Sequence, residues 1–101
     1  MLLFYRTSLD AADVLAAADA FFTAAPVSLT PTKDGGGPRE RSYSGSLGAV
    51  KLRVRAEGGH YTFVEVRTDQ IGESRLDKNV KRFFVALHRK TEPTHALEAA
   101  Y

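Results

Sequence analysis

Basic and aromatic side chains alternate with apolar ones along two neighbouring stretches of the chain, between residues 51 and 67. If both stretches are strands, their period of two places these side chains on one face of a sheet. Arginine stacks on aromatic rings, and nucleic-acid bases stack on such rings while nearby cations hold phosphates. The sequence therefore predicts a candidate surface for single-stranded nucleic acid, with a solvated face or a contact with a second subunit as the alternatives. We call it the basic-aromatic face: Lys51, Arg53, Arg55, Tyr61, Phe63 and Arg67.

A second candidate surface consists of small side chains at helical spacing, namely Ala12, Ala16, Ala20 and Thr23. Solvent-facing helix positions usually carry longer side chains, so a smooth face permits the close approach of another helix, including a symmetry mate. Alanine is also the best helix former, which would explain the same face without a partner. Both interpretations, a dimer contact and plain helix propensity, stay open at this point.

Four phenylalanines give a third candidate, because bulky rings can wall a cavity for an apolar ligand between the sheet and the helices. These are Phe21, Phe22, Phe83 and Phe84. At helical spacing they are more simply core residues, and a short chain has little volume to spare for a cavity.

Residues that support catalysis or metal binding do not form a pattern. His60, His88 and His95 are predicted in a turn, a helix and the tail, without metal-ligand spacing. No nucleophile motif occurs, and the three glycines at residues 35–37 do not lie in the strand-to-helix context of a phosphate-binding loop. We expect no enzyme activity, no metal and no cofactor.

The composition predicts one soluble domain over residues 1–101. A chain of 101 residues buries roughly 60 to 70% of its unfolded surface, which is enough to fold without staples. The net charge is +2, and the absence of cysteine excludes disulfides and is compatible with a reducing cytosol. The first residues lack the pattern of a signal peptide, and no stretch approaches the roughly 20 apolar residues that span a bilayer. We expect a cytoplasmic protein without membrane contact.

Residues 47–68 predict a β-hairpin with a three-residue loop at residues 57–59. Gly59 can supply the positive φ that such a loop requires. This loop pairs Ala56 with His60 and places Leu52 opposite Val64. A slip of one residue would set Leu52 opposite a glutamate, so the hydrophobic pattern favours the predicted loop.

Three further strands are predicted from short apolar runs that end in polar or turn residues. They cover residues 1–7, 27–32 and 39–44. The glycine-rich segment at residues 33–38 is expected to be a flexible loop.

Two helices are predicted from apolar periodicity and capping residues. The first has Asp10 as its N-cap and stops at Pro26, with an apolar face of Val14, Ala18, Phe21, Phe22 and Ala25. The second begins with a capping box of Ser74 and Asp77 and carries a stripe of Leu76, Val80, Phe83 and Leu87. Residues 91–101 are expected to fray at the end of the chain or to form a short turn of helix.

The predicted order β-α-β-β-β-β-α indicates an α+β fold. We expect a two-layer sandwich in which an antiparallel sheet of about five strands carries both helices on one face. A ferredoxin-like βαββαβ domain is the alternative, and it would need a last strand from the C-terminal tail.

The sequence thus predicts a small, non-catalytic binding or assembly domain whose partner is a second copy of itself. Binding of single-stranded nucleic acid through the basic-aromatic face is the first alternative. A small apolar ligand between sheet and helices is the second.

Overall fold

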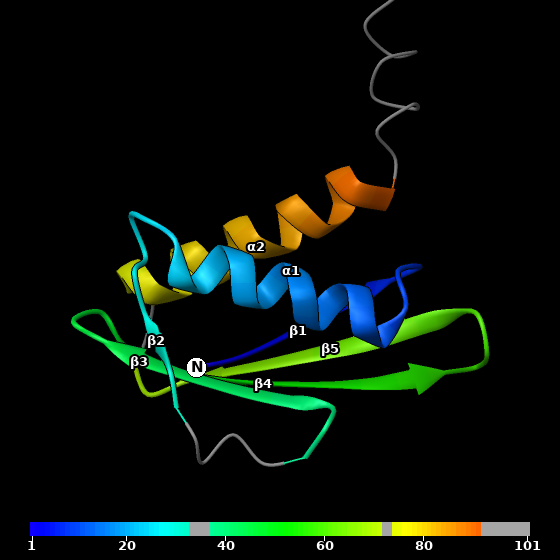
Figure 1. Cartoon of the computed structure of the whole chain (residues 1–101), viewed down its shortest axis with the longest axis horizontal. Helices are drawn as coiled ribbons and strands as arrows, with labels where there is room; N and C mark the ends of the chain where they lie inside the picture. The colour runs from blue at the N-terminus through cyan, green and yellow to red at the C-terminus, as the bar shows by residue number, and fades with distance from the viewer. Residues whose placement is uncertain (33–36, 72–73, 92–101) are drawn as a thin grey trace, which may run out of the picture.

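Five antiparallel strands form one sheet, and two helices lie on the same side of it (Figure 1). The structure is a computed structural model that describes residues 1–32, 37–71 and 74–91. Its elements follow the order β1 (Leu2–Thr7), α1 (Ala11–Thr23), β2 (Thr30–Pro31), β3 (Glu40–Gly45), β4 (Gly48–Glu57), β5 (Tyr61–Thr68) and α2 (Arg75–Thr91). The strand order in the sheet is β1-β5-β4-β3-β2. The predicted α+β sandwich is confirmed, and the ferredoxin-like alternative does not describe this sheet.

Helix α1 begins at the predicted cap, where the Asp10 side chain accepts a hydrogen bond of 2.8 Å from the Asp13 backbone N–H. Its predicted apolar face is buried at Val14, Ala18 and Phe22. The helix ends at Thr23. The prediction that Ala25 extends this buried face is wrong, because Ala25 follows the helix end and is exposed.

Helix α2 is held to the sheet by its capping box. The Asp77 backbone N–H donates to Ser74 Oγ at 3.2 Å, and the Asp77 carboxylate accepts from the Ser74 N–H at 3.2 Å. The same buried carboxylate accepts a hydrogen bond of 2.8 Å from Thr68 Oγ1 at the end of β5. The cap therefore fixes both the start of the helix and its position over the sheet.

The hairpin of β4 and β5 forms with its register shifted by two residues from the prediction. Glu57 pairs with Tyr61, so the loop contains residues 58–60 instead of 57–59. Gly58 and Gly59 have φ values of 65° and 75°. Two successive positive φ values need two glycines, and this moves the loop one residue along the chain.

The predicted pairs of this hairpin are therefore wrong, although the predicted faces are right. Ala56 pairs with Thr62 and Leu52 with Val66. A shift by two residues keeps the alternation of side chains, so each residue stays on its predicted side of the sheet.

The strands before the hairpin are shorter or displaced. The predicted strand at residues 27–32 forms a ladder only at Thr30–Pro31, although Val27 and Leu29 are buried. The next strand begins and ends one residue later than predicted. Residues 33–36 of the predicted flexible loop and residues 92–101 of the predicted tail lie outside the described residues.

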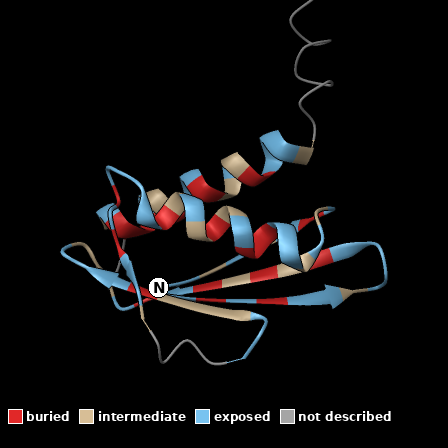
Figure 2. Cartoon of the chain, viewed as in Figure 1, coloured by how far each residue is buried: buried red, intermediate tan, exposed pale blue. Residues whose placement is uncertain are grey.

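The core lies between the sheet and the helices, as the burial colours in Figure 2 show. Phe22 and Phe83 are fully buried and their ring centroids are 5.0 Å apart. Tyr43 lies against Phe22 and donates a hydrogen bond of 2.6 Å to the Asp19 carboxylate on α1. Arg41 contacts the same carboxylate at 3.3 Å. This cluster joins the first helix to β3.

Candidate functional site

The sheet face opposite the helices carries the whole basic-aromatic face. Buried and exposed positions alternate along β4 and β5, which places the six predicted residues on the outer side. The observed register sets Arg55 opposite Phe63 and Lys51 opposite Arg67. The sequence prediction of one common face is therefore right.

The ring of Phe63 is surrounded by neighbouring side chains. The guanidinium groups of Arg55 and Arg6 lie 4.6 Å and 5.2 Å from its centroid. The ring of Phe4 lies 5.3 Å away. These contacts occupy the surface on which a nucleic-acid base would have to stack.

Acidic side chains lie at ion-pair distance from three of the five cations on this face. Glu57 accepts from Arg6 Nε at 2.6 Å, and its other oxygen is 3.9 Å from Arg55. Arg53 pairs with Glu40 on β3 at 3.0 Å. The face that was predicted to be basic and aromatic thus carries cross-strand ion pairs and cation–π contacts.

Lys51 and Arg67 differ from these cations. They lie directly opposite each other on β4 and β5, and both are exposed. Within the described ranges, neither has an acidic group at ion-pair distance. They share a hollow with Arg53, Glu40 and Glu65, which leaves an excess of one positive charge at this end of the face.

Strand β1 adds residues to this face that the sequence analysis missed. The exposed fraction of Phe4 is 53% and that of Leu2 is 41%. Both lie on the outer side, because Leu3 and Tyr5 pack against the core. The available signal was that residues 2–5 are apolar or aromatic at every position, since the period of two in a strand must leave half of these side chains on the side away from the helices.

Strand β1 is also an edge of the sheet. Thr68 N–H donates to the Met1 carbonyl at 2.8 Å, and the Met1 ammonium donates to the Thr68 carbonyl at 3.1 Å. In an antiparallel ladder such bonded positions alternate, so Leu3, Tyr5 and Thr7 bond to β5. The backbone N–H and C=O groups of Leu2, Phe4 and Arg6 consequently point to the open side.

Only two of the four residues in the predicted small-residue surface of α1 line a hollow in the structure. Ala12, Ala16, Ala20 and Thr23 are all exposed. Ala16 and Ala20 face a hollow between α1 and α2, on the side of the helices away from the sheet. Ala12 and Thr23 do not line it. We call this hollow the helix trough.

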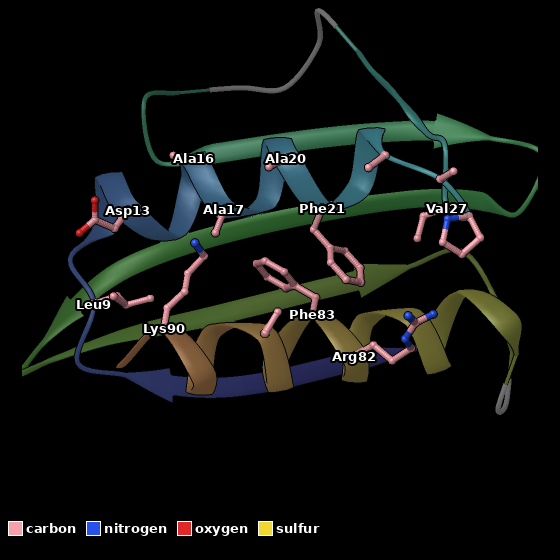
Figure 3. A pocket seen from close by; sticks show the side chains of 14 residues that line it. Leu9, Asp13, Ala16, Ala17, Ala20, Phe21, Val27, Arg82, Phe83 and Lys90 are labelled. Atoms are coloured by element: carbon pink, nitrogen blue, oxygen red, sulfur yellow. The ribbon is translucent and has the colours of Figure 1, made fainter. Parts of the chain in front are cut away.

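The helix trough has a volume of about 760 Å³ and is mostly apolar (Figure 3). Six of the fourteen residues that line it are alanines: Ala16, Ala17, Ala20, Ala24, Ala25 and Ala86. Phe21 and Phe83 meet across its middle, with their ring centroids 5.5 Å apart. Leu9 lies at one end and Val27 at the other, so residues before and after α1 bound the trough.

The four phenylalanines predicted to wall a cavity have different positions. Phe22 and Phe83 fill the core between sheet and helices. Phe84 stacks on Tyr5 of β1 with ring centroids 5.1 Å apart. Phe21 is partly exposed and borders the helix trough, which lies between the two helices.

Two groups outside these surfaces have shifted pKa values. Burial raises the pKa of the Tyr43 hydroxyl well above its usual range, and the hydrogen bond to Asp19 adds to the effect. The hydrogen bond from the Ala49 N–H lowers the pKa of the exposed Asp69 carboxyl, and the Gln70 side chain acts in the same direction. Both groups have structural hydrogen-bond partners.

Among residues 1–32, 37–71 and 74–91, no three His, Asp or Glu side chains come together as a metal site would require. His60 lies exposed in the hairpin loop, and His88 is exposed on α2. Within the same residues, no helix is both long enough and apolar enough to cross a membrane. His95 lies outside the described residues.

Comparison with protein-family models and with curated proteins finds no match for this sequence.

Proposed function

We propose that this protein is a small, non-catalytic assembly domain that forms a homodimer by pairing the β1 edges of two copies. The single observation that carries the proposal is the open edge of β1, with exposed Phe4 at its centre. The proposal places the protein in the cytoplasm, in keeping with its lack of cysteine.

The two edges of the sheet differ in a way that supports this choice. The β2 edge has two residues and ends in Pro31, which cannot donate a ladder hydrogen bond. The β1 edge has six residues, no proline and a single charged side chain, Arg6. Proteins usually protect long apolar edges with charges, proline or a covering element, so an edge of this kind suits a partner strand.

The sequence of β1 is compatible with pairing to itself about a two-fold axis. An axis through Phe4 places Leu2 of one copy opposite Arg6 of the other, and sets the two Phe4 residues side by side. The open N–H and C=O groups of these residues would exchange about six hydrogen bonds in an antiparallel ladder. The Phe4 and Phe63 rings of both copies would then form one aromatic cluster on the outer face.

The solution mass of the protein tests the proposal. Phe4→Lys puts two like charges on the axis and a lysine on an exposed edge, so we expect a monomer. Tyr61→Lys is the matched control, because Tyr61 is 55% exposed on the same face but is not on the edge strand. Light scattering coupled to size exclusion should give a dimer for the native chain and Tyr61→Lys. A monomeric native chain at high concentration would refute the proposal.

Binding of single-stranded nucleic acid is the second candidate function. The observation that favours it is the exposed pair of Lys51 and Arg67, which have no ion-pair partner among the described residues. Two phosphate contacts predict a slope of about −1.4 for log affinity against log salt. Because Phe63 is already covered by arginines, we place the contact at these two cations and not at the ring.

Fluorescence anisotropy with a labelled mixed-sequence oligonucleotide tests this candidate. The double change Lys51→Gln with Arg67→Gln should remove binding, whereas Phe63→Ala should leave it within about two-fold. No binding of the native chain at low salt would rule the candidate out.

A further inference from the structure

The helix trough is an apolar hollow of about 760 Å³, and it does not contribute to the proposed dimer edge. We infer that it binds an anionic amphiphile, an alkyl chain that ends in a carboxylate. The alkyl chain lies over Phe21 and the alanine walls, and the carboxylate lies at Arg82. This inference does not depend on the proposed homodimer.

The size and shape of the trough favour a small molecule over a partner helix. Its volume of about 760 Å³ is in the range of small-molecule sites, which is roughly 300 to 1,000 Å³. Its α1 wall runs from Asp13 to Ala24, a rise of about 16 Å. Leu9 lies at one end and Val27 at the other (Figure 3). A ligand of limited length fits such a hollow, whereas a continuing helix needs a groove with open ends.

The side chains that line the trough favour an alkyl chain. Phe21 is partly exposed and is the largest accessible apolar side chain of the trough, fully buried Phe83 packs against it, and six alanines leave room around it. The surface offers few polar groups in the middle, so a sugar or a nucleotide would lose its hydrogen bonds to water.

The charges at the two ends decide where the anionic head lies. Lys90 extends from α2 toward α1 at the end where Asp13 stands on the opposite wall. Asp13 would repel a carboxylate there. Arg82 lies at the other end of the trough. It also lines an adjoining hollow of about 530 Å³ that continues along α2 to Arg89, and no acidic residue lines that hollow. Guanidinium groups bind carboxylates through paired hydrogen bonds, so this end suits the head group.

Titration of the protein with dodecanoate below its critical micelle concentration, monitored by backbone amide NMR shifts, tests the inference. We expect saturable binding of one molecule per chain, with shifts at Ala16–Phe21 and around Ala86. Dodecyltrimethylammonium, which has the same chain and a positive head, should bind at least about ten-fold more weakly because it meets Arg82. Each methylene removed from dodecanoate should weaken binding by about two- to four-fold.

Two pairs of variants locate the site. Ala20→Leu fills the trough and should abolish binding, whereas Ala12→Leu, on the same helix but outside the trough, should not change it. Arg82→Gln should weaken binding about ten-fold, and Lys78→Gln, an exposed cation of the same helix outside the trough, should leave it unchanged. Thermal unfolding of each variant controls for folding.

Three results would overturn the inference. The first is equal binding of the two amphiphiles with opposite heads. The second is unchanged dodecanoate binding in Ala20→Leu. The third is binding of anionic lipid vesicles without any one-to-one binding of dodecanoate, which would indicate a membrane surface as the partner. None of these results bears on the solution mass that tests the homodimer.

Discussion

The ring of Phe63 lies between two guanidinium groups, and at the scale of single residues these neighbours decide what the ring can bind. Sequence patterning identified Phe63, Arg53 and Arg55 as parts of one face. It did not identify Glu40 and Glu57 as their partners, because those pairings depend on which strands are neighbours and in which register. An arginine that is already paired with a carboxylate contributes less to ligand binding than an unpaired one. Counting arginines in the sequence therefore overestimates what the face can bind.

Tyr43 provides a prediction at this scale that depends on pH. Its pKa is raised by burial and by the hydrogen bond to Asp19, whereas an unfolded tyrosine ionises near pH 10. Above pH 10 the folded state therefore binds more protons than the unfolded state, and the free energy of unfolding falls as the pH rises. The loss should be up to about 1.4 kcal/mol per pH unit.

Tyr43→Phe keeps the ring and removes this ionisation. At pH 7 the variant should be less stable by about 1 kcal/mol, because it loses one hydrogen bond. Urea unfolding of both proteins between pH 7 and 11 checks the prediction, and the native advantage should shrink above pH 10. Parallel stability curves across that range would contradict it.

At the scale of elements, the turn before β4 and the turn between β4 and β5 impose different requirements on glycine. Gly48, at the start of β4, has a φ of 128°, and a Cβ there would lie 2.6 Å from Asp69 Oδ1 and Gln70 Nε2. That carboxylate also accepts the Ala49 N–H at 3.0 Å. Gly59 has a φ of 75° with open space around it.

Substitution of these glycines by alanine should therefore have unequal effects. Gly48→Ala should lower the free energy of unfolding by about 2 kcal/mol or more, because strain adds to the clash with Asp69. Gly59→Ala should lower it by about 1 kcal/mol, from the positive φ alone. Denaturant midpoints measure both, and an equal or larger loss for Gly59→Ala would contradict this account.

Most elements could be predicted from the sequence because their signals are local. The Asp10 cap, the capping box of Ser74 and Asp77, and the apolar stripe of α2 each depend on residues a few positions apart. The hairpin register was missed by two residues, since the choice between adjacent glycines changes the loop without changing the hydrophobic pattern. Local periodicity cannot distinguish two registers that differ by two residues, because both keep every side chain on the same face.

The candidate surfaces were predictable only in part for a different reason. The alanines of α1 were visible in the sequence, but the helix trough exists because α2 lies beside them at a distance that leaves the space open. Likewise, residues 1–7 predict a strand, and only the sheet order shows that this strand is an edge. Properties that depend on the packing of elements far apart in the chain cannot be predicted from short segments of sequence.

At the scale of the whole molecule, the edge and the trough are separate surfaces. The edge belongs to the sheet layer, whereas the trough opens on the side of the helices away from the sheet (Figures 1 and 3). In the proposed dimer, pairing of β1 joins the two sheets into one of ten strands and leaves a trough on each copy. A ligand in the trough and a partner at the edge can therefore be tested independently with Ala20→Leu and Phe4→Lys.

The most direct test of the proposed dimer is cysteine cross-linking at the two-fold axis. The chain has no cysteine, so Phe4→Cys introduces a single thiol, and paired β1 edges would bring two such thiols within reach of a disulfide. Mild oxidation at low protein concentration should convert Phe4→Cys to a covalent dimer much faster than Tyr61→Cys, which is equally exposed away from the edge. Cross-linking of Phe4→Cys at the same slow rate as Tyr61→Cys would contradict the β1 dimer.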